Sequence, residues 1–391
     1  MKTFLIKIGK AFNVLKRDGI IRGGRRVATA FFALFRRVGS GDILFITGGV
    51  GDSALYRAHH QAEELNLRGF RCSVTVQDNP LLARYADRFK IFIFHRTLYT
   101  PLLKKMIEEI KKQKKEIIFE TDDLVFDPKY LEYMDYFQHM NSLEKKLYEK
   151  GVGGEILSDP YLKTCVATTS FLAEKLREYG KKVFISKNKL SNKDLETANQ
   201  ILETRFPKSS NIVKIGYLSG TISHNKDFAA VEGALLKVMR KFPEVVLFLA
   251  GPLDIGPAFD PMKERVERSK FVSRKKHFEN ISGLDINIAP LEEGNPYCEA
   301  KSELKFFEAG ILGVPTVATA TQTFRETIRD GEDGFVASGN EEWAEKLEKL
   351  IQDEDLRKEM GAKAREKTLA EHVTKNSHNE EYYVYLRSKL A

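Results

Sequence analysis

The chain has 391 residues, enough for two domains of ordinary size, and its 42% hydrophobic and 30% charged residues exclude a disordered chain. No apolar run approaches the ~20 residues that a membrane-spanning helix needs, and no secretory signal with a cleavage site is recognisable. The three cysteines lie far apart, in no metal-binding spacing, which favours a reducing compartment. We therefore expect a cytoplasmic protein.

Positive charge is concentrated in residues 1–40. Ten lysines and arginines against one aspartate give this arm a net charge of +9, whereas the whole chain has +8, so the remainder is close to neutral. Apolar residues recur in the arm at helical spacing. Such a basic amphipathic arm suits an anionic membrane, so we expect possible peripheral association with the inner membrane face. The alternative is a pair of helices packed on the body with a solvated basic face. Nucleic acid is not expected, because the body has no basic stripe.

The first α/β unit begins with an apolar strand at residues 43–47, a glycine-rich turn, a helix and a second strand at 71–76. This order is typical of a parallel βαβ unit. Gly49 and Gly51 let backbone N–H groups approach a ligand closely, and Tyr56 and Arg57 follow in the first turn of the helix. These four residues are therefore candidates for contact with a ligand. Tight-turn glycine is the alternative explanation for the turn.

Polar residues follow the next two strands of the first half. His95 ends the strand at 90–94, and Asp122 and Asp123 follow the strand at 116–120. Ligands of open α/β sheets bind outside the carboxyl ends of the strands, which makes His95, Asp122 and Asp123 catalytic candidates. A structural histidine is the alternative for His95. The two aspartates lack the intervening residue of a metal-binding DxD signature, and we expect no metal.

The second half repeats the alternation. A strand at 213–218 leads into a loop with Gly220, Thr221, His224 and Lys226 directly before a helix. Backbone N–H groups and a lysine in this arrangement can hold a phosphate, although a plain surface turn is the alternative. Further strands are predicted at 165–169, 183–186, 245–250, 285–291, 316–319 and 334–337.

Residues 301–319 read as a helix that Gly313 and Pro315 end, followed by a short buried strand. Lys301 and Lys305 fall near the start of that helix, where cations are unfavourable unless an anion such as a diphosphate binds. Glu308, one turn after Lys305, can accept hydrogen bonds from a ribose or sugar diol. The alternative is a solvated amphipathic helix with a Lys–Glu pair.

The pattern predicts an α/β protein with two Rossmann-like, doubly wound parallel-sheet domains that face a central cleft. We expect a basic arm (1–40), a first Rossmann-like domain (41–200), a second Rossmann-like domain (201–370) and a C-terminal helix (371–391) that packs back on the first domain.

Several motifs resemble known enzymes. The segments Ala289-Pro-Leu291, Lys305 with Phe307-Glu308-Ala309, and Leu312-Gly-Val-Pro-Thr316 are similar to the C-terminal half of family 4 glycosyltransferases of the GT-B fold. More loosely, Tyr56-Arg57 and Phe94-His95-Arg96 resemble bacterial cell-surface polysaccharide transferases of the same superfamily. The resemblance implies a retaining enzyme whose second domain (201–370) holds a nucleotide-sugar donor and whose first domain (41–200) receives the acceptor.

This resemblance implies roles for particular residues. Glu308 matches the glutamate that binds the donor ribose, and Lys226 matches the loop lysine that meets the diphosphate. The family's earlier paired glutamate falls at Ala300, so Glu299 is a substitute in another register, and Lys301 with Ser302 takes over anion binding. Ser219-Gly220 stands where the family has an arginine. Diphosphate binding is therefore assigned to Gly220, Thr221, Lys226, Lys301, Ser302 and Lys305, and donor-sugar or acceptor contacts to Gly49, Gly51, Tyr56, Arg57, His224 and Glu299.

The expected function is transfer of a sugar from a nucleotide-diphosphate sugar to a glycan or lipid-linked acceptor in cell-surface polysaccharide biosynthesis. The donor is a substrate, so no cofactor is expected, and lysines replace a metal in stabilising the leaving diphosphate. Two alternatives remain: a catalytically inactive sugar-nucleotide-binding partner of an assembly complex, and a GT-B sugar-nucleotide epimerase.

Overall fold

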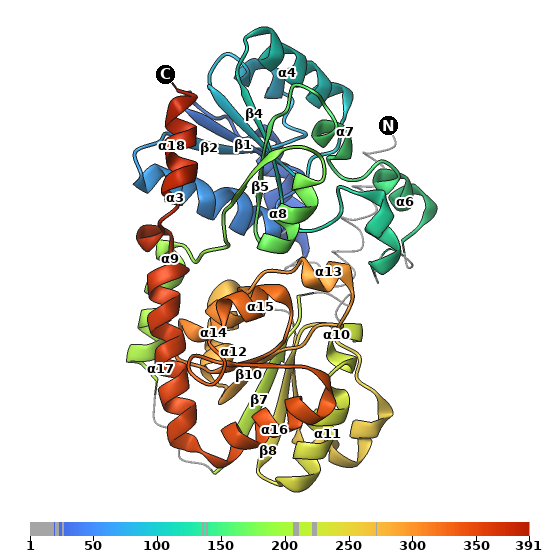
Figure 1. Cartoon of the computed structure of the whole chain (residues 1–391), viewed down its shortest axis with the longest axis vertical. Helices are drawn as coiled ribbons and strands as arrows, with labels where there is room; N and C mark the ends of the chain where they lie inside the picture. The colour runs from blue at the N-terminus through green and yellow to red at the C-terminus, as the bar shows by residue number, and fades with distance from the viewer. Residues whose placement is uncertain are drawn as a thin grey trace. The chain divides into compact units, whose positions relative to one another are not determined.

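The computed structural model describes residues 19, 23–25, 27–134, 137, 140–205, 211–220, 225–270 and 272–390, without the side chains of residues 143 and 144 (Figure 1). The chain forms two compact units. The first combines residues 1–187 with 378–391, and the second spans residues 188–377. Most of the predicted N-terminal arm lies outside the described residues, and its described part is helical at residues 27–35.

The first unit is built on a six-stranded parallel sheet with the order β2-β1-β3-β4-β5-β6. Central strands are buried on both faces, which explains why their sequences are continuously apolar instead of alternating. Ile43 pairs in register with Ile91, so the carboxyl ends of β1 and β3 lie side by side. The strands are β1 (Ile43–Thr47), β2 (Cys72–Val76), β3 (Ile91–His95), β4 (Glu116–Thr121), β5 (Thr164–Ala167) and β6 (Lys182–Ile185).

Helices of the first unit follow the predicted alternation. The helix after β1 has three parts: α2 (Asp52–Ala54), a π-helical turn (Leu55–His60) and α3 (Gln61–Leu67). Thr100 and Thr169 cap the next two long helices through their side-chain oxygens, which accept from backbone N–H groups. The other helices are α4 (Pro101–Lys112), α6 (Ser142–Tyr148), α7 (Gly154–Leu157) and α8 (Ser170–Arg177).

The first unit is completed by α18 (Glu380–Ser388), from the far end of the chain. Figure 1 shows this red helix next to the blue α3. Tyr382, Tyr383 and Leu386 are buried in the same apolar cluster as the strand residues of β1 and β3. The Tyr383 hydroxyl also donates to Glu64 Oε1 at 2.6 Å.

The second unit has its own six-stranded parallel sheet, in the order β12-β11-β10-β7-β8-β9. Its strands are β7 (Val213–Leu218), β8 (Val245–Ala250), β9 (Val266–Ser269), β10 (Ile286–Ala289), β11 (Thr316–Thr319) and β12 (Phe335–Ala337). The two sheets confirm the predicted fold class of two Rossmann-like domains.

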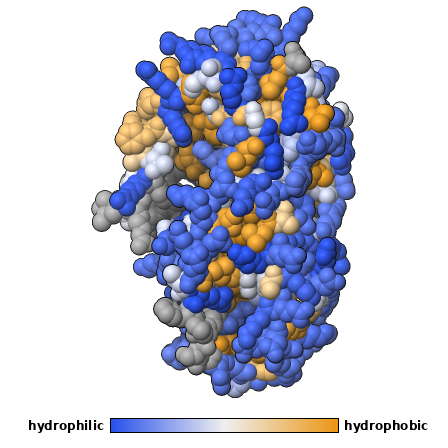
Figure 2. Space-filling view, turned by 90° about the vertical axis from the view of Figure 1, so that its left-hand side faces the viewer, coloured by the Kyte–Doolittle hydropathy of each residue, from blue (hydrophilic) through white to orange (hydrophobic). Residues whose placement is uncertain are grey.

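Helices cover the second sheet. Apolar residues of α11 (Glu232–Lys241) and α16 (Gly339–Gln352) share one buried cluster with the strands, and these two helices lie side by side in Figure 1. The remaining helices are α9 (Asn192–Glu203), α10 (Asn225–Ala229), α12 (Arg274–Ser282), α13 (Pro296–Glu299), α14 (Leu304–Gly310), α15 (Gln322–Thr327) and α17 (Glu354–Glu371). On the face that Figure 2 shows, apolar side chains form separate patches in a largely hydrophilic surface.

Three local predictions were wrong. The predicted helix at residue 301 begins only at Leu304, because residues 301–303 form the connection from α13. The edge strand β9 was not predicted, since its sequence Val-Glu-Arg-Ser lacks an apolar run. The polar sequence of residues 190–211 predicts a helix without a clear apolar face, yet α9 buries Leu195, Ala198 and Ile201 within the second unit.

Candidate functional site

A cavity of about 290 Å³ opens in the first unit at the carboxyl ends of β1 and β3. The glycine turn after β1, the start of α2 and the end of β3 form most of its wall. Two of the predicted glycines contribute to it, and so does His95. The lining residues are Gly48, Gly49, Gly51, Ser53, Ala54, Gln77, His95, Arg96, Leu98, Leu147, Tyr148 and Val152.

The first glycine of the turn brings two strand ends into contact. A Cβ at Gly48 would lie 2.0 Å from the carbonyl oxygen of Arg96, far inside van der Waals contact. Arg96 itself has a left-handed backbone, with φ of 48°. Only glycine at position 48 therefore allows the ends of β1 and β3 to approach this closely. Gly49 and Gly51 meet no such contact and line the cavity.

The polar side chains that follow the first-unit strands meet in one cluster. Ser53 Oγ donates to Asp122 Oδ2 at 2.6 Å and lies 3.0 Å from His95 Nε2. Arg96 NH1 lies 3.2 Å from Asp122 Oδ1 and 2.9 Å from Asp123 Oδ2. The structure thus brings together all three predicted catalytic residues, His95, Asp122 and Asp123, and adds Ser53 and Arg96 to them.

The charges of this cluster are unequal. Burial alone would raise the pKa of Asp122, but the Arg96 cation and hydrogen bonds from His95 and Ser53 hold that pKa well below its usual range. Burial raises the pKa of Asp123 despite Arg96. An ionised Asp122 can only accept hydrogen bonds. The cluster therefore contains one carboxylate that stays charged and one that protonates more readily.

Tyr56 and Arg57 do not line this cavity. The Arg57 side chain is fully buried; its Nε donates to Glu120 Oε1 at 2.6 Å and its NH1 to the Ser186 carbonyl oxygen at 2.7 Å. Tyr56 is buried against the ring of His60. The guanidinium group of Arg57 is thus paired with an internal carboxylate and does not line this cavity, and its donor-sugar or acceptor contact stays a prediction.

In the second unit, Lys301 lies in an acidic and polar pocket of side chains. Its ammonium group is 2.9 Å from Asp227 Oδ2, and the thiol of Cys298 contacts Asp227 Oδ1 at 3.2 Å. Ser302 Oγ accepts a hydrogen bond from Asn188 at 2.9 Å. Lys301 therefore approaches the start of α10, which follows the predicted phosphate loop, instead of belonging to α14.

Lys305 lies in the first turn of α14. Its ammonium group donates to the carbonyl oxygen of Leu218, the last residue of β7, and lies 4.8 Å from the centroid of the Tyr217 ring. Burial lowers the pKa of Lys305 to about 8, and the charges of Glu308, Lys301 and Asp227 also act on it. The predicted lysines and glutamate therefore share one electrostatic environment at the carboxyl end of β7.

Glu308 is buried between two basic side chains. Arg274 NH1 donates to its Oε1, and His277 Nε2 lies 3.1 Å from its Oε2. Glu299, its proposed substitute partner, accepts from the backbone N–H of Gln322 at 3.0 Å. The structure thus separates the roles of the two glutamates: Glu308 contacts α12, and Glu299 contacts the start of α15.

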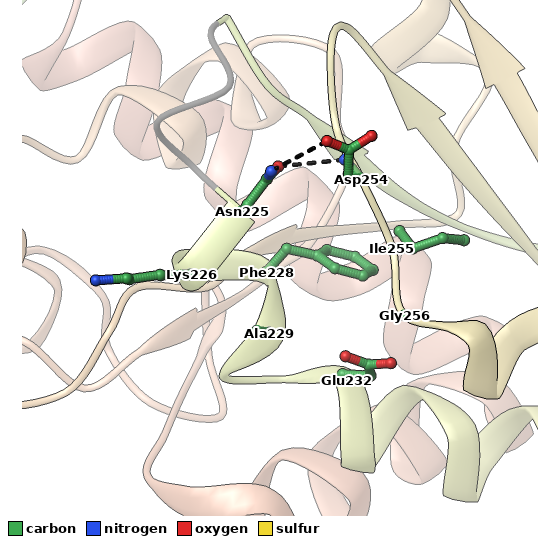
Figure 3. Close-up of a pocket in the computed structure, with 8 residues that line it drawn as sticks. All are labelled: Asn225, Lys226, Phe228, Ala229, Glu232, Asp254, Ile255 and Gly256. Carbon is green, nitrogen blue, oxygen red and sulfur yellow. Dashed lines mark hydrogen bonds between the residues drawn. The ribbon is translucent and has the colours of Figure 1, made fainter. Parts of the chain in front are cut away.

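The loop after β7 is only partly described. Gly220 is exposed, whereas Thr221 and His224 lie outside the described residues. Lys226 borders a pocket of about 360 Å³, but Figure 3 shows its side chain pointing away from the other lining residues. Asn225 points into the pocket and contacts Asp254 (Figure 3). Phe228 forms its apolar floor.

Known proteins resemble this chain in sequence and structure. Residues 233–380 match a family model described as glycosyl transferase-like. The glycosyltransferase from Rickettsia africae ESF-5 is 16% identical and superposes over 90% of this chain and 99% of its own, with a TM-score of 0.60. HepE from Anabaena, solved with UDP-glucose, is 14% identical over 89% of this chain and 99% of its own, with a TM-score of 0.56.

Sucrose-phosphate synthase from Thermosynechococcus elongatus is also similar, at 14% identity over 89% of this chain and 98% of its own, with a TM-score of 0.56. The similarity therefore extends over both units of this chain. The chain has the GT-B glycosyltransferase fold. The family match over residues 233–380, together with the fold, supports a transferase that acts on sugars. Comparison with curated protein sequences gives no match.

In this GT-B protein, the site residues that were not predicted from the sequence are those that contact the predicted site residues. Ser53, Asp227, Arg274 and His277 each contact a predicted site residue. Two signals were available: Ser53 directly follows the glycine turn, and Asp227 directly follows Lys226. No sequence signal connects Arg274 or His277 to Glu308, because they meet only through the packing of α12 on α14.

Proposed function

We propose that this GT-B protein moves a sugar from a nucleotide-diphosphate sugar to a glycan or lipid-linked acceptor in cell-surface polysaccharide biosynthesis. One observation supports the donor most directly. Lys301, Lys305 and Glu308 interact electrostatically at the carboxyl end of β7, inside or beside the glycosyl transferase-like segment. Two cations beside one carboxylate suit a diphosphate joined to a ribose.

The proposed transfer proceeds with retention and needs no metal. Negative charge develops on the leaving diphosphate, and Lys301 and Lys305 would stabilise it there. Lys226 and Gly220, in the loop after β7, are proposed to contact the same diphosphate. No general base is assigned. Binding holds the acceptor hydroxyl against the anomeric carbon, which converts the encounter into a positioned reaction.

The acceptor is proposed to bind the first-unit cavity. Its wall combines His95 and Ser53 with backbone groups of Gly49 and Gly51, and Asp122 lies directly behind Ser53. Neutral hydroxyls suit these groups better than a second anion does, because the two carboxylates beside Arg96 outnumber that cation. His95, Asp122 and Asp123 are therefore proposed to act at the acceptor end.

We further propose that the N-terminal arm attaches the protein to anionic membranes. Within the described residues no helix is long and apolar enough to cross a bilayer. The helical residues 27–35 instead present three phenylalanines whose side chains are 56%, 71% and 56% exposed: Phe31, Phe32 and Phe35. Exposed arginines, Arg36 and Arg37, follow them directly. Aromatic rings beside cations suit the interface of an anionic bilayer.

Vesicle co-sedimentation tests the membrane proposal. The full chain is expected to sediment with phosphatidylglycerol-containing vesicles and much less with pure phosphatidylcholine. Replacing Phe31, Phe32 and Phe35 by serine should lower that binding, whereas Val384→Ser, at an exposed apolar residue of α18, should leave it unchanged. Equal binding by all three proteins contradicts a role for the arm.

One observation keeps a second function in view. Ala300 stands in the register of the family's earlier glutamate and is fully buried, while Glu299 binds a backbone N–H group. A catalytically inactive, sugar-nucleotide-binding partner of an assembly complex would tolerate that loss. Such a protein would bind the donor without cleaving it.

A donor panel separates the two functions. Thermal shift with UDP-, GDP-, ADP- and dTDP-sugars identifies the nucleotide, and donor hydrolysis or transfer with the best binder measures turnover. The main proposal expects stabilisation together with slow donor hydrolysis that an acceptor accelerates. Stabilisation without any turnover supports the inactive partner, and no stabilisation by any donor contradicts both.

A further inference from the structure

The cavity of the first unit has a wall of mixed character. One part is polar and comes from the glycine turn after β1, from Ser53 and from His95. The other part is apolar or aromatic and comes from the segment after β3, from α6 and from the turn after α6. Its residues are Leu98, Leu147, Tyr148 and Val152. A lipid chain would cover the polar groups without bonding to them, which is costly. The cavity therefore suits a ligand with one apolar and one polar side.

Tyr148 ends α6, and the turn that follows holds it at the cavity. The backbone N–H of Gly151 donates to the Tyr148 carbonyl oxygen at 2.8 Å, and that of Val152 donates to the Val125 carbonyl oxygen at 2.7 Å. Gly151 has a φ of 73°, and a Cβ there would lie 1.8 Å from the carbonyl oxygen of Phe126. Only glycine allows the end of α6 to approach the segment after β4 this closely.

The charges beside Tyr148 favour an uncharged ligand. Arg96 contributes a cation to the cavity wall, and its NH1 lies 3.2 Å from Asp122 Oδ1 and 2.9 Å from Asp123 Oδ2. Burial alone would lower the pKa of Arg96, but the charges of Asp123, Asp122 and Tyr148 raise it. The guanidinium group is therefore already paired. A carboxylate or phosphate on the ligand would meet the charge of Asp122 as well, and like charges repel.

A pyranose has the required two-sided character. Its ring C–H groups form an apolar face, and its hydroxyl groups project from the edge of the ring. The face of an aromatic ring carries partial negative charge, which attracts such C–H groups. The cavity of about 290 Å³ is at the small end of ligand pockets, which span roughly 300–1,000 Å³. This volume favours a single sugar ring over a longer glycan.

We infer that Tyr148 binds the apolar face of a single neutral pyranose, the terminal sugar of the acceptor. This makes Tyr148 a specificity-determining residue of the acceptor site. The inference rests on the proposed function, which places the acceptor in this cavity. It adds the chemical class of the acceptor: a neutral pyranoside instead of a uronate or a sugar phosphate.

Saturation-transfer-difference NMR on the full chain tests this class. The neutral probes are the methyl pyranosides of glucose, galactose, mannose and N-acetylglucosamine, and the charged probes are methyl glucuronide and methyl galacturonide. At least one neutral probe should bind, and the ring protons on one of its faces should receive the most saturation. Both uronates should bind about threefold or more weakly than the best neutral probe, because like charges repel in a partly buried site.

Variants assign the binding to Tyr148. Tyr148→Phe keeps the aromatic face and should bind the best neutral probe about as tightly as the wild type, whereas Tyr148→Ala should bind it about three- to tenfold more weakly. Tyr148→Leu keeps a large apolar side chain in case the alanine variant does not fold, and should lose the contrast between the two faces of the probe. Tyr133→Ala, at an exposed tyrosine of the same unit outside the cavity wall, is the control and should keep the wild-type affinity.

The outcomes are distinct. Weaker binding by Tyr148→Ala or Tyr148→Leu, together with normal binding by Tyr133→Ala, supports the inference. Equal affinities of the wild type and the Tyr148 variants, preference for a uronate, or no binding of any neutral probe overturns it. Each of these last results leaves the donor part of the proposed function standing, which fails separately if no nucleotide sugar stabilises the protein.

Discussion

The ammonium group of Lys305 donates a hydrogen bond to the main-chain carbonyl oxygen of Leu218, where β7 ends. A carbonyl is a weak partner for a buried cation, so the cost of burial dominates and the pKa of Lys305 falls to about 8. A diphosphate arriving at this strand end would be a far stronger partner. The bond to Leu218 thus marks the position that an anion would take over.

Nucleotide binding is therefore expected to depend on pH through Lys305. Below pH 8 the lysine is charged and the affinity for a nucleoside diphosphate should be constant; above it, the affinity should fall by up to about tenfold per pH unit, because the anion needs the protonated form. Calorimetry between pH 7 and 9 measures this. Lys305→Met should bind more weakly and show a flat profile, and parallel profiles for both proteins would contradict the assignment.

The same lysine should affect stability in a definite direction. Its pKa is lowered in the folded protein from 10.5, so between pH 8 and 10.5 the unfolded chain binds more protons than the folded chain. The contribution of Lys305 to the free energy of unfolding should then rise as pH increases through that window. Urea unfolding of the wild type at pH 7 and 9, with Lys305→Met as reference, measures the difference. A stability gap between the two proteins that is independent of pH contradicts it.

Lys301→Ala and Glu308→Ala should each reduce turnover by about tenfold or more without unfolding the protein, because each removes one charged contact to the donor. Kinetics with the nucleotide sugar chosen by the donor panel, together with circular dichroism, provide the measurement. Lys349→Ala, which removes an exposed pair with Glu345, is the control and should behave as wild type. Near-normal kinetics in both site variants would refute the donor site.

In the first unit, the hydrogen bonds among Ser53, His95 and Asp122 determine which atoms carry the protons. Asp122 is an acceptor, so the Ser53 proton points to Asp122, and the 3.0 Å contact with His95 then requires a proton on His95 Nε2. Nitrogen-15 NMR of labelled histidine should therefore show neutral His95 as the Nε2–H form. His95→Gln identifies its signal among the eight histidines.

Asp122→Asn should reverse this arrangement. Arg96 contacts Oδ1 of Asp122, so the amide oxygen is expected to stay there and the amide nitrogen to face Ser53. Ser53 would then accept from the amide and donate to His95, which moves the imidazole proton to Nδ1. If the tautomer of His95 is the same in the wild type and in Asp122→Asn, the proposed hydrogen bonds from Ser53 to Asp122 and from His95 to Ser53 are wrong.

Arg57 should matter for stability, not for binding. Arg57→Ala leaves Glu120 charged and fully buried without its partner, which should lower the free energy of unfolding by about 3–5 kcal/mol. Urea unfolding measures this, with exposed Lys104→Ala as the control. Replacing both residues, as Arg57→Met with Glu120→Leu, should restore most of the stability. If Arg57→Ala is as stable as the wild type but binds substrate with a different affinity, Arg57 contributes to ligand binding and not to stability.

Much of the fold could be predicted because strand periodicity and glycine turns are local. The strands β1, β7, β8 and β11 were predicted with their observed bounds. The edge strand β9 could not be, since charged side chains face solvent there and its pairing with β8 is a tertiary contact. Likewise α14 starts later than its periodicity indicates, because α13 and its connection take up residues 296–303.

The candidate site was predictable only in part. Sequence position relative to strand ends indicated His95 and Asp122, because parallel strands bring their carboxyl ends to one edge, and a cation at a helix start indicated Lys305. It could not reveal which partner each side chain finds. Arg57 lies three positions after the cavity-lining Ala54 yet binds Glu120, and Arg274 reaches Glu308 across 34 positions of sequence. Such choices depend on side-chain packing that no local pattern encodes.

The placement of α18 has a consequence for how the protein is made. During synthesis, every residue of the second unit, which ends at residue 377, is translated before the residues of α18. Until then the apolar surface of the first unit that Tyr382, Tyr383 and Leu386 cover stays open. The unit that starts first is therefore finished last, and a chain truncated before α18 would contain every residue of the second unit but lack part of the apolar core of the first.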